Sequence, residues 1–180
     1  MLCFTELNTP VGRITLAAEE DALVGLWLQG QKYDRAALQG RETVRRGDLP
    51  VFAAAAEWLD AYFAGQRPEA GALPLRPQGS VFRQRVWRRL CRIPYGETIT
   101  YGEIARQIAA ETGVPSCSAQ AVGGAVGHNP ISILIPCHRV VGADGSLTGY
   151  AGGLDVKRRL LALEGVDLTR LYTPTRGTAL

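Results

Sequence analysis

The chain has 180 residues, of which 46% are hydrophobic and 21% charged, with a formal net charge of +3. This length suits one larger domain or two small ones, and the apolar content is enough for a real core. No apolar run has the length of a membrane span, and no basic segment followed by an apolar one opens the chain. We therefore expect a soluble, cytoplasmic protein that is not exported.

The cysteines indicate the redox compartment, and the distribution of charge indicates a possible kind of partner. The four cysteines (3, 91, 117 and 137) are far apart and form no C-x-x-C pair, which argues against a disulfide framework and fits a reducing compartment. Residues 1–79 hold 8 Lys/Arg against 10 Asp/Glu, whereas residues 80–160 hold 10 against 5. The basic second half suggests a polyanionic partner. On charge alone, a basic face that only contacts solvent explains it equally well.

The first part of the chain predicts three strands and a helix. Short segments rich in β-forming residues, separated by turn residues, predict strands at Leu2–Asn8, Gly12–Ala18 and Ala22–Gln29. Residues 30–50 are polar and predict a loop. Val51–Ala64 is Ala-rich and amphipathic, which predicts a helix.

The Pro- and Gly-rich residues 65–79 predict a linker to a second domain. Nothing in residues 1–79 indicates chemistry, so we expect this part of the chain to play a supporting role.

A set of helices follows the linker. Ser80 is a candidate N-cap of an arginine-rich helix that reaches Arg92. The capping-box pattern Thr100–Glu103 predicts a second helix that ends near Thr112, and Ser118–Gly127 predicts a third. Two helices joined by a short turn in a basic region indicate a helix-turn-helix, a weak signal alone because most helix pairs bind no DNA.

The third helix has almost no bulky side chains. Residues 119–127 read AQAVGGAVG, and glycine is costly inside a helix, so its three glycines need a reason. Small residues allow the close approach of another helix, or of a narrow groove such as the minor groove of DNA. From this feature alone we expect helix packing to be the reason.

A reactive thiol is predicted in the next segment. Ile131–Ile135 predicts a short buried strand, and the following residues place Cys137 beside His138. A thiol attacks electrophiles as the thiolate, and a neighbouring His and cationic surroundings favour that form. Adjacent residues on a strand point to opposite faces, so we expect a bridging water rather than direct contact. The alternative is a buried cysteine that acts as a small hydrophobe.

The last part of the chain predicts a turn and a helix. Ala143–Gly145 has the composition of a hairpin turn. Leu154–Glu164 predicts a helix with Asp155 as its candidate cap. The residues from Val166 onward are expected to be peripheral.

The segment Asn129–Val140, NPISILIPCHRV, resembles the active-site signature of the O6-alkylguanine-DNA alkyltransferases, also called methylated-DNA–protein-cysteine methyltransferases. Further segments match the family in the same order. They are Tyr95–Tyr101, Ala121–Gly124, Gly149–Gly153 and Leu160–Gly165. The resemblance is specific over Ser80–Gly165 and architectural over residues 1–79.

The resemblance implies an α/β (α+β) protein of two domains. Residues 1–78 would form an RNase-H-like supporting domain, residues 79–166 a winged helix-turn-helix domain, and residues 167–180 a tail. The implied activity is repair of double-stranded DNA, approached from the minor groove, by transfer of an alkyl group from O6 of guanine or O4 of thymine to Cys137.

The predicted product limits the number of turnovers. An alkyl carbon on oxygen is a soft electrophile, thiolate sulfur is a soft nucleophile, and the thioether that they form cannot undergo thiol–disulfide exchange. The sequence shows no cofactor motif and no second nucleophile that could regenerate the thiol. We therefore expect a monomer that acts once and needs no cofactor.

Three more residues complete the expected catalytic set. We interpret His138 as the base and Glu164 as the carboxylate that orients His138 and stabilises its charged form. Glu164 lies at a helix C-terminus, where a negative charge opposes the macrodipole, and this supports a functional role. The family implies that Asn129 organises the active-site turn, although an Asn before a Pro also suits turn geometry alone.

The resemblance also implies residues that contact the base and the duplex. Tyr101 would hydrogen-bond the extruded guanine, and the carbonyls of Cys137 and Val140 would accept from its amino group. Tyr150 and Ala151 would wall the alkyl pocket. The helix residues expected at the DNA are Gln120, Ala121, Gly123 and Gly124.

Some positions depart from the family pattern. Gln120 stands where most relatives carry an Arg that replaces the flipped base, so we expect weaker duplex binding or slower extrusion. Ala151 replaces a frequent Ser and offers only a backbone N–H. Human-type relatives have an N-terminal zinc site. Here only Cys3 lies near the start and the His residues are 128 and 138, so we predict no metal and expect His128 to face solvent.

Two other functions compete with alkyl transfer. An alkyltransferase-like protein that binds lesions without transfer would lack the reactive cysteine, and Cys137 argues against it. A cysteine hydrolase with a Cys-His-Glu triad would need an oxyanion hole, for which the sequence offers no specific evidence.

Overall fold

The N-terminal sheet follows from three consecutive strands that alternate with tight turns. In the computed structural model, which describes residues 1–175, β1 (Leu2–Thr9), β2 (Gly12–Glu19) and β3 (Ala22–Leu28) form an antiparallel meander. β4 (Thr43–Arg45) pairs in parallel with β1, which gives the order β3-β2-β1-β4.

Residues 30–50 are therefore more than the loop that we expected. They contain β4 and the 3₁₀ helix η1 (Ala36–Leu38). A three-residue strand at a sheet edge leaves no period-2 pattern that sequence inspection could recognise.

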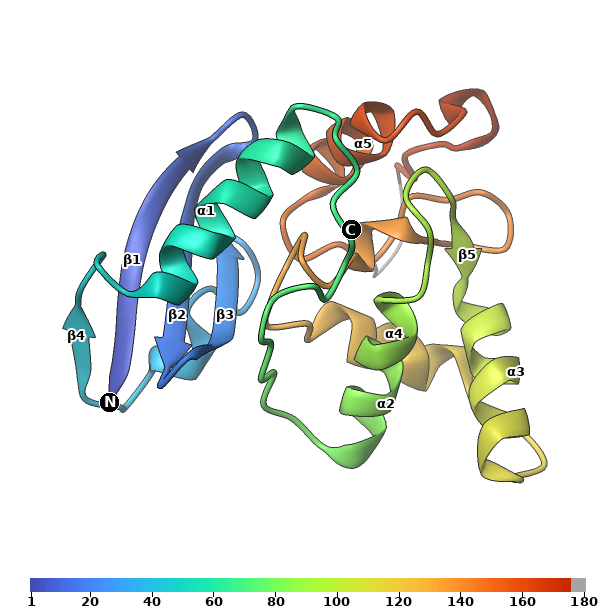
Figure 1. Cartoon of the computed structure of the whole chain (residues 1–180). Helices are drawn as coiled ribbons and strands as arrows, with labels where there is room; N and C mark the ends of the chain where they lie inside the picture. Colours follow the sequence, from blue (N-terminus) through green and yellow to red (C-terminus); the bar gives the residue numbers. More distant parts are fainter. Residues whose placement is uncertain (176–180) are drawn as a thin grey trace.

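Helix α1 (Pro50–Phe63) covers one face of the sheet, as Figure 1 shows. Its buried side chains include Phe52 and Leu59, which belong to the same apolar cluster as Ile14 and Leu16 of the sheet. A smaller cluster on other sheet residues surrounds Trp27. The main cluster continues into the C-terminal half of the chain, so the two halves share one core.

The expected linker is attached to the sheet edge. The carbonyl of Pro74 accepts a hydrogen bond from the Leu23 amide at 2.8 Å, and the Arg76 amide donates to the Leu23 carbonyl at 2.7 Å. Backbone pairing on the open edge of β3 thus fixes the path between the two halves.

The C-terminal half is mainly helical. Its first helices are α2 (Val81–Leu90), α3 (Tyr101–Thr112) and α4 (Ala119–Gly127). The expected Ser80 cap and the capping box between Thr100 and Glu103 are present, and the Ser118 side chain caps α4. A two-stranded parallel sheet is formed by β5 (Ile99–Thr100) and β6 (Val140–Val141).

The chain ends differently from the prediction. Helix α5 (Leu154–Leu163) begins after Gly153 without a side-chain cap, so the interpretation of Asp155 as the cap was wrong. Asp155 lies in the first turn of the helix, where its charge still complements the macrodipole. The segment around η3 (Leu168–Arg170) is not peripheral. Leu168 and Leu171 pack on the apolar cluster of Val141, Leu147 and Leu161, and the backbone of Tyr172 pairs with that of Ser146.

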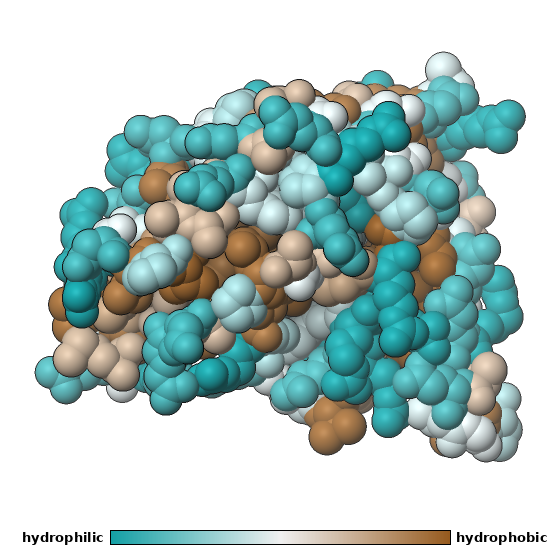
Figure 2. All heavy atoms as spheres, in the orientation of Figure 1, coloured by the Kyte–Doolittle hydropathy of each residue, from teal (hydrophilic) through white to brown (hydrophobic). Residues whose placement is uncertain are grey.

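The surface differs between the halves. Figure 2 shows hydrophilic side chains over α2, whereas hydrophobic surface is visible mainly beside α1. The α2 arginines are Arg83, Arg85, Arg88 and Arg89. None of the helices within residues 1–175 is long and apolar enough to cross a membrane.

We predict that Gly25→Ala destabilises the fold by about 1–3 kcal/mol through overpacking. A Cβ at this position would lie 1.8 Å from the Trp27 ring, so the buried indole would have to move. Urea unfolding monitored by circular dichroism measures the change.

Gly102→Ala is the matched control. In α3 the new Cβ would meet only the end of the Arg106 side chain at 3.7 Å, and alanine favours helix by about 0.5–1 kcal/mol. Equal stability of the two variants would contradict the role of Gly25.

Candidate active site

The loop that carries Cys137 is attached to the N-terminal sheet. The Leu26 amide of β3 donates to the Pro130 carbonyl at 2.9 Å, and the Ser132 amide donates to the Leu26 carbonyl at 3.0 Å. Because β3 is itself held within the sheet, these two bonds fix the loop against a rigid element.

The loop is a pair of tight turns and not the strand that we predicted at Ile131–Ile135. The Leu134 amide donates to the Ser132 carbonyl at 2.8 Å across Ile133, whose φ is +70°. A second bond of the same kind joins the Cys137 amide to the Ile135 carbonyl at 2.8 Å. Positive φ is rare for a β-branched residue and costs about 1–3 kcal/mol, so the surrounding packing imposes this turn.

Cys137 and His138 lie in the 3₁₀ helix η2 (Cys137–Arg139). We expected them to point to opposite faces of a strand, and this was wrong because the two residues are not in a strand. In one helical turn, neighbouring side chains diverge without being opposite, and the structure records no hydrogen bond between the two.

Asn129 organises the turn from its own side chain. Its Nδ2 donates to the Ile135 carbonyl at 2.8 Å and to Cys137 Sγ at 3.1 Å, while its Oδ1 accepts from the Ile131 amide at 3.0 Å. Asn129 is itself buried. One amide group thus closes the loop and places a donor on the thiol sulfur.

The environment of Cys137 differs from the expected activated thiol. Burial raises the pKa of the Cys137 thiol, and the Asn129 hydrogen bond and the Lys157 charge oppose this effect without outweighing it. The nearby cation does favour the thiolate, as expected, but burial of the thiol, which is only 4% exposed, outweighs its effect. The thiol needs a base to react.

His138 has the properties of that base. Burial lowers the pKa of His138, and the Arg139 and Lys157 charges lower it further, although Glu164 acts in the opposite direction. Its Nε2 lies 2.6 Å from Glu164 Oε1. Among the described residues, Nδ1 has no hydrogen-bond partner, so in the neutral ring with Nε2–H it is a free acceptor.

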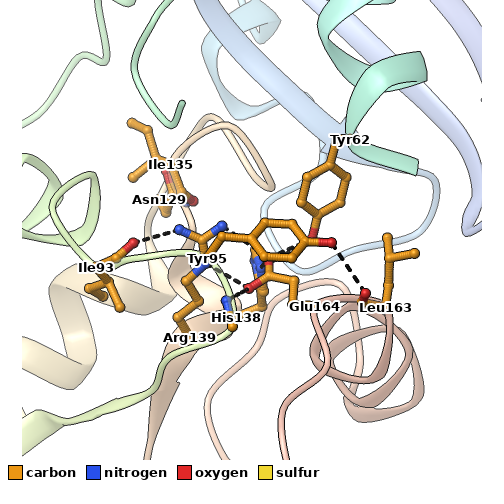
Figure 3. Close-up of polar contacts among 10 residues, drawn as sticks. Tyr62, Ile93, Tyr95, Asn129, Ile135, His138, Arg139, Leu163 and Glu164 are labelled. Carbon is orange, nitrogen blue, oxygen red and sulfur yellow. Dashed lines mark hydrogen bonds and ion pairs between the residues drawn. The ribbon is translucent and has the colours of Figure 1, made fainter. Parts of the chain in front are cut away.

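Glu164 is the centre of the buried polar cluster (Figure 3). Arg139 binds both of its oxygens, with Nε 2.8 Å from Oε2 and Nη2 3.0 Å from Oε1. Tyr62 OH donates to Oε1 at 2.7 Å, and the Gly96 amide donates to Oε2 at 3.1 Å. Burial alone would raise the pKa of Glu164, but His138 and Arg139 together lower it to about 2.

Sequence reasoning missed three of these residues. Arg139 follows His138 directly and was treated as part of the motif only. Lys157 is fully buried in α5 and donates to the carbonyls of Val140 and, at 2.7 Å, Thr148. A basic residue among the apolar positions of an amphipathic helix was the available signal for Lys157.

The sequence gives no signal for the role of Tyr62, because Tyr62 lies in α1 and its hydrogen bond to Glu164 joins the two halves of the chain. The N-terminal half therefore does more than support, contrary to our expectation. The residues that follow β3 also reach the site. Gln31 Oε1 lies 3.3 Å from Ser132 Oγ, and the Lys32 amide donates to the Ala151 carbonyl at 3.0 Å.

Tyr33 stacks on His128 with ring centroids 4.4 Å apart. His128 is accordingly half-buried rather than facing solvent, and its Nδ1 contacts the Gly124 carbonyl at 2.7 Å.

The expected base-contacting residues lie around the thiol. Tyr101 OH donates to the Thr148 carbonyl at 2.8 Å, and burial raises the pKa of Tyr101 to about 12. Tyr150 is buried and its ring lies nearly perpendicular to that of His138, and among the described residues its hydroxyl has no partner. Ala151 lies next to it on the same loop and is half-buried.

The exposed face of α4 carries Gln120, Ala121 and Gly124. A Cβ at Gly124 or Gly127 would meet nothing within 4 Å, and one at Gly123 would make ordinary contact with the Tyr101 ring. Helix packing therefore does not require these glycines, and our expectation that it does was wrong. No group of three or more His, Cys, Asp or Glu within residues 1–175 is placed to hold a metal ion.

Comparison with known proteins agrees with this architecture. Residues 2–77 match the model of the 6-O-methylguanine DNA methyltransferase, ribonuclease-like domain, and residues 81–166 match that of the 6-O-methylguanine DNA methyltransferase, DNA binding domain. A methylated-DNA–protein-cysteine methyltransferase of Mycolicibacterium paratuberculosis is 49% identical over 164 residues, which cover 91% of this chain and 93% of that protein. One of Haemophilus influenzae is 39% identical over 165 residues, 92% and 87% of the two chains.

A solved structure supports the same relationship. Mycobacterium tuberculosis OGT in complex with DNA has a TM-score of 0.77 and 42% identity, covering 94% of each chain. A ribonuclease-like unit joined to a DNA-binding unit is the architecture of a DNA-repair methyltransferase. The chain belongs to the methylated-DNA–protein-cysteine methyltransferase family, which confirms the resemblance and the fold class predicted from the sequence.

We predict that Glu164→Gln destabilises the protein by about 3–5 kcal/mol at neutral pH, because it leaves the Arg139 charge buried without its counter-charge. The pKa of Glu164 lies below its ordinary value of 4.5, at about 2. Its stabilising contribution is therefore full above pH 4.5 and is lost as the pH falls toward 2. Urea unfolding at several pH values should show the difference from wild type narrowing in that window.

Glu111→Gln is the control, because Glu111 pairs with Arg89 on the surface. Exposed pairs contribute about 0–1 kcal/mol. A Glu164 variant no less stable than the Glu111 variant would contradict the structural role of the buried carboxylate.

Proposed function

We propose that this protein repairs DNA by transferring the alkyl group of O6-alkylguanine, and of O4-alkylthymine, to its own Cys137. The observation that carries the proposal is a buried thiol that Asn129 contacts, in the same helical turn as a His138 that is hydrogen-bonded to Glu164. Names and structures of the relatives support DNA as the partner. We also propose that the protein is a monomer and acts in the cytoplasm, where thiols stay reduced.

The reaction moves one proton and one alkyl group. His138 Nδ1 takes the proton of Cys137 through a bridging water, and the thiolate sulfur attacks the alkyl carbon as the C–O6 bond breaks. The electron pair of that bond stays on the guanine, which takes up a proton equivalent to the one that the thiol lost. The products are a thioether at Cys137 and an unmodified guanine. Because a thioether does not undergo thiol–disulfide exchange, each molecule acts once.

The base must leave the helix to reach a thiol that is 4% exposed. The carbonyls of Cys137 and Val140 already accept bonds from the Val140 amide and Lys157, but each carbonyl has a second lone pair for the guanine amino group. Tyr150 and Ala151 then wall the alkyl group, and Tyr101 contacts the base.

Helix α4 is the element that we place in the minor groove. Gln120, Ala121 and Gly124 form its exposed face, and the absence of a side chain at Gly124 lets the helix backbone approach the narrow groove. The basic charge of residues 80–160 suits phosphate contacts on either side.

We predict stoichiometric alkylation of Cys137 when the protein is mixed with a duplex that contains O6-methylguanine. Mass spectrometry of the peptide that contains Cys137 should show one added methyl group and no more than one turnover per molecule. Multiple turnovers without protein methylation would instead indicate a hydrolase, and tight lesion binding without transfer would indicate a lesion reader.

Cys137→Ala is the matched control for that experiment. It removes the nucleophile while it keeps a small apolar side chain, so transfer should stop and duplex binding should remain. Loss of binding together with transfer would show that Cys137 is structural.

We predict that Gln120→Arg binds a lesion-containing duplex more tightly and repairs it faster. The added charge contacts DNA phosphates, and a longer planar side chain fills the gap left by the flipped base, where unstacking costs a few kcal/mol. Binding isotherms at two salt concentrations and single-turnover rates measure the two effects. Unchanged affinity and rate would show that Gln120 does not contact the duplex.

A further inference from the structure

Tyr62 is the one side chain of the N-terminal sheet unit that binds the carboxylate of the proposed site. Its hydroxyl donates to Glu164 Oε1 at 2.7 Å, the oxygen that also faces His138 Nε2 at 2.6 Å. Tyr62 and His138 are both fully buried, and Tyr62 OH lies 3.4 Å from His138 Nε2. Two donors from opposite halves of the chain thus converge on one oxygen (Figure 3).

The proton positions in this cluster follow from the charge of Glu164. The carboxylate is ionised and can only accept, so Tyr62 O–H and His138 Nε2–H both point to Oε1. That arrangement leaves Nδ1 as the unprotonated nitrogen of His138. It is also the nitrogen without a partner among residues 1–175.

We propose that Tyr62 is a positioning residue for alkyl transfer: its hydroxyl fixes the Glu164 carboxylate and limits the negative charge that Oε1 presents to His138. This inference rests on the proposed function. A bond donated to Oε1 by Tyr62 withdraws charge from the oxygen, and His138 gains less by becoming protonated. His138 therefore stays neutral and ready to accept the thiol proton.

Removing only the hydroxyl tests this effect. The charged and titratable groups that surround His138 are Tyr62, Cys137, Arg139, Tyr150, Lys157 and Glu164. Tyr62→Phe keeps the ring and its stacking on Trp58, and changes none of the other groups. Because the site is already closed to solvent, the exchange of O–H for H changes the hydration of His138 little.

We expect the acid limb of the transfer rate against pH to move to higher pH in Tyr62→Phe. The shift should be about half a unit to one unit, which lowers the rate on that limb about three- to tenfold. Single-turnover transfer from an O6-methylguanine duplex, measured across the pH range, gives the profile. A purely structural role would lower the rate equally at every pH.

Tyr95→Phe is the matched control. Tyr95 makes an edge contact with the Tyr62 ring, but its hydroxyl donates to the Leu163 carbonyl at 3.2 Å and not to the carboxylate. The Tyr95 variant should keep the wild-type profile. An unshifted profile for Tyr62→Phe, or an equal shift for both variants, would overturn the inference, whereas absence of transfer by the wild type would overturn the proposed function.

A second measurement can overturn the inference even if Tyr62→Phe does not fold. The chain contains only two histidines, so ¹⁵N-labelled histidine gives two sets of ring signals. The wild-type protein should show His138 with a proton on Nε2 and none on Nδ1. The opposite tautomer in the wild type would overturn the inference directly.

Discussion

The structure depends on the neutralisation of one buried carboxylate, that of Glu164. A charge in the interior is tolerated only when it is paired and fully hydrogen-bonded. Glu164 meets this condition by collecting donors from separate parts of the chain: Tyr62 in α1, Gly96 before β5, and His138 and Arg139 in η2. Each donor has to reach the same point, so the carboxylate fixes how α1, η2 and the end of α5 pack together.

The pairing also sets the charge available for chemistry. Arg139 and Glu164 cancel, and the resting cluster needs neither a charged His138 nor a thiolate. On the proposed mechanism, the proton passes from Cys137 to His138 inside the cluster, so its net charge does not change. The thiolate then forms only as one half of an ion pair, near the Lys157 ammonium, and burial keeps the thiol unreactive until a substrate fills the site.

Much of the fold was predictable because it depends on local signals. The strands of the meander, the Ser80 cap, the capping box at Thr100 and the helix that begins near Ser118 were each predicted from neighbouring residues. What could not be predicted depends on tertiary contacts. The turn at Ile133 contradicts the preference of its own residue and is held by β3, and the raised pKa of Cys137 follows from burial, which adjacent residues do not reveal.

The residues of the candidate site also divide into those that the sequence predicted and those that depend on tertiary contacts. Cys137, His138, Asn129 and Glu164 were found because they belong to recognisable segments, and the structure brings them together. Arg139 and Tyr62 were missed because their roles exist only through Glu164. The glycines of α4 were misinterpreted because sequence cannot distinguish a surface that touches another helix from one that is open.

The position of the site between the two halves explains why the N-terminal unit is not a separable support. The loop from Asn129 to Cys137 is bonded to β3 on one side and to α4 through Asn129 on the other. An alkyl group on Cys137 adds atoms to a side chain that is buried, and overpacking at a buried position costs about 1–3 kcal/mol. The strained turn at Ile133 and the sulfur contact of Asn129 adjoin that added volume. The same contacts that hold the thiol for reaction therefore oppose its alkylated form.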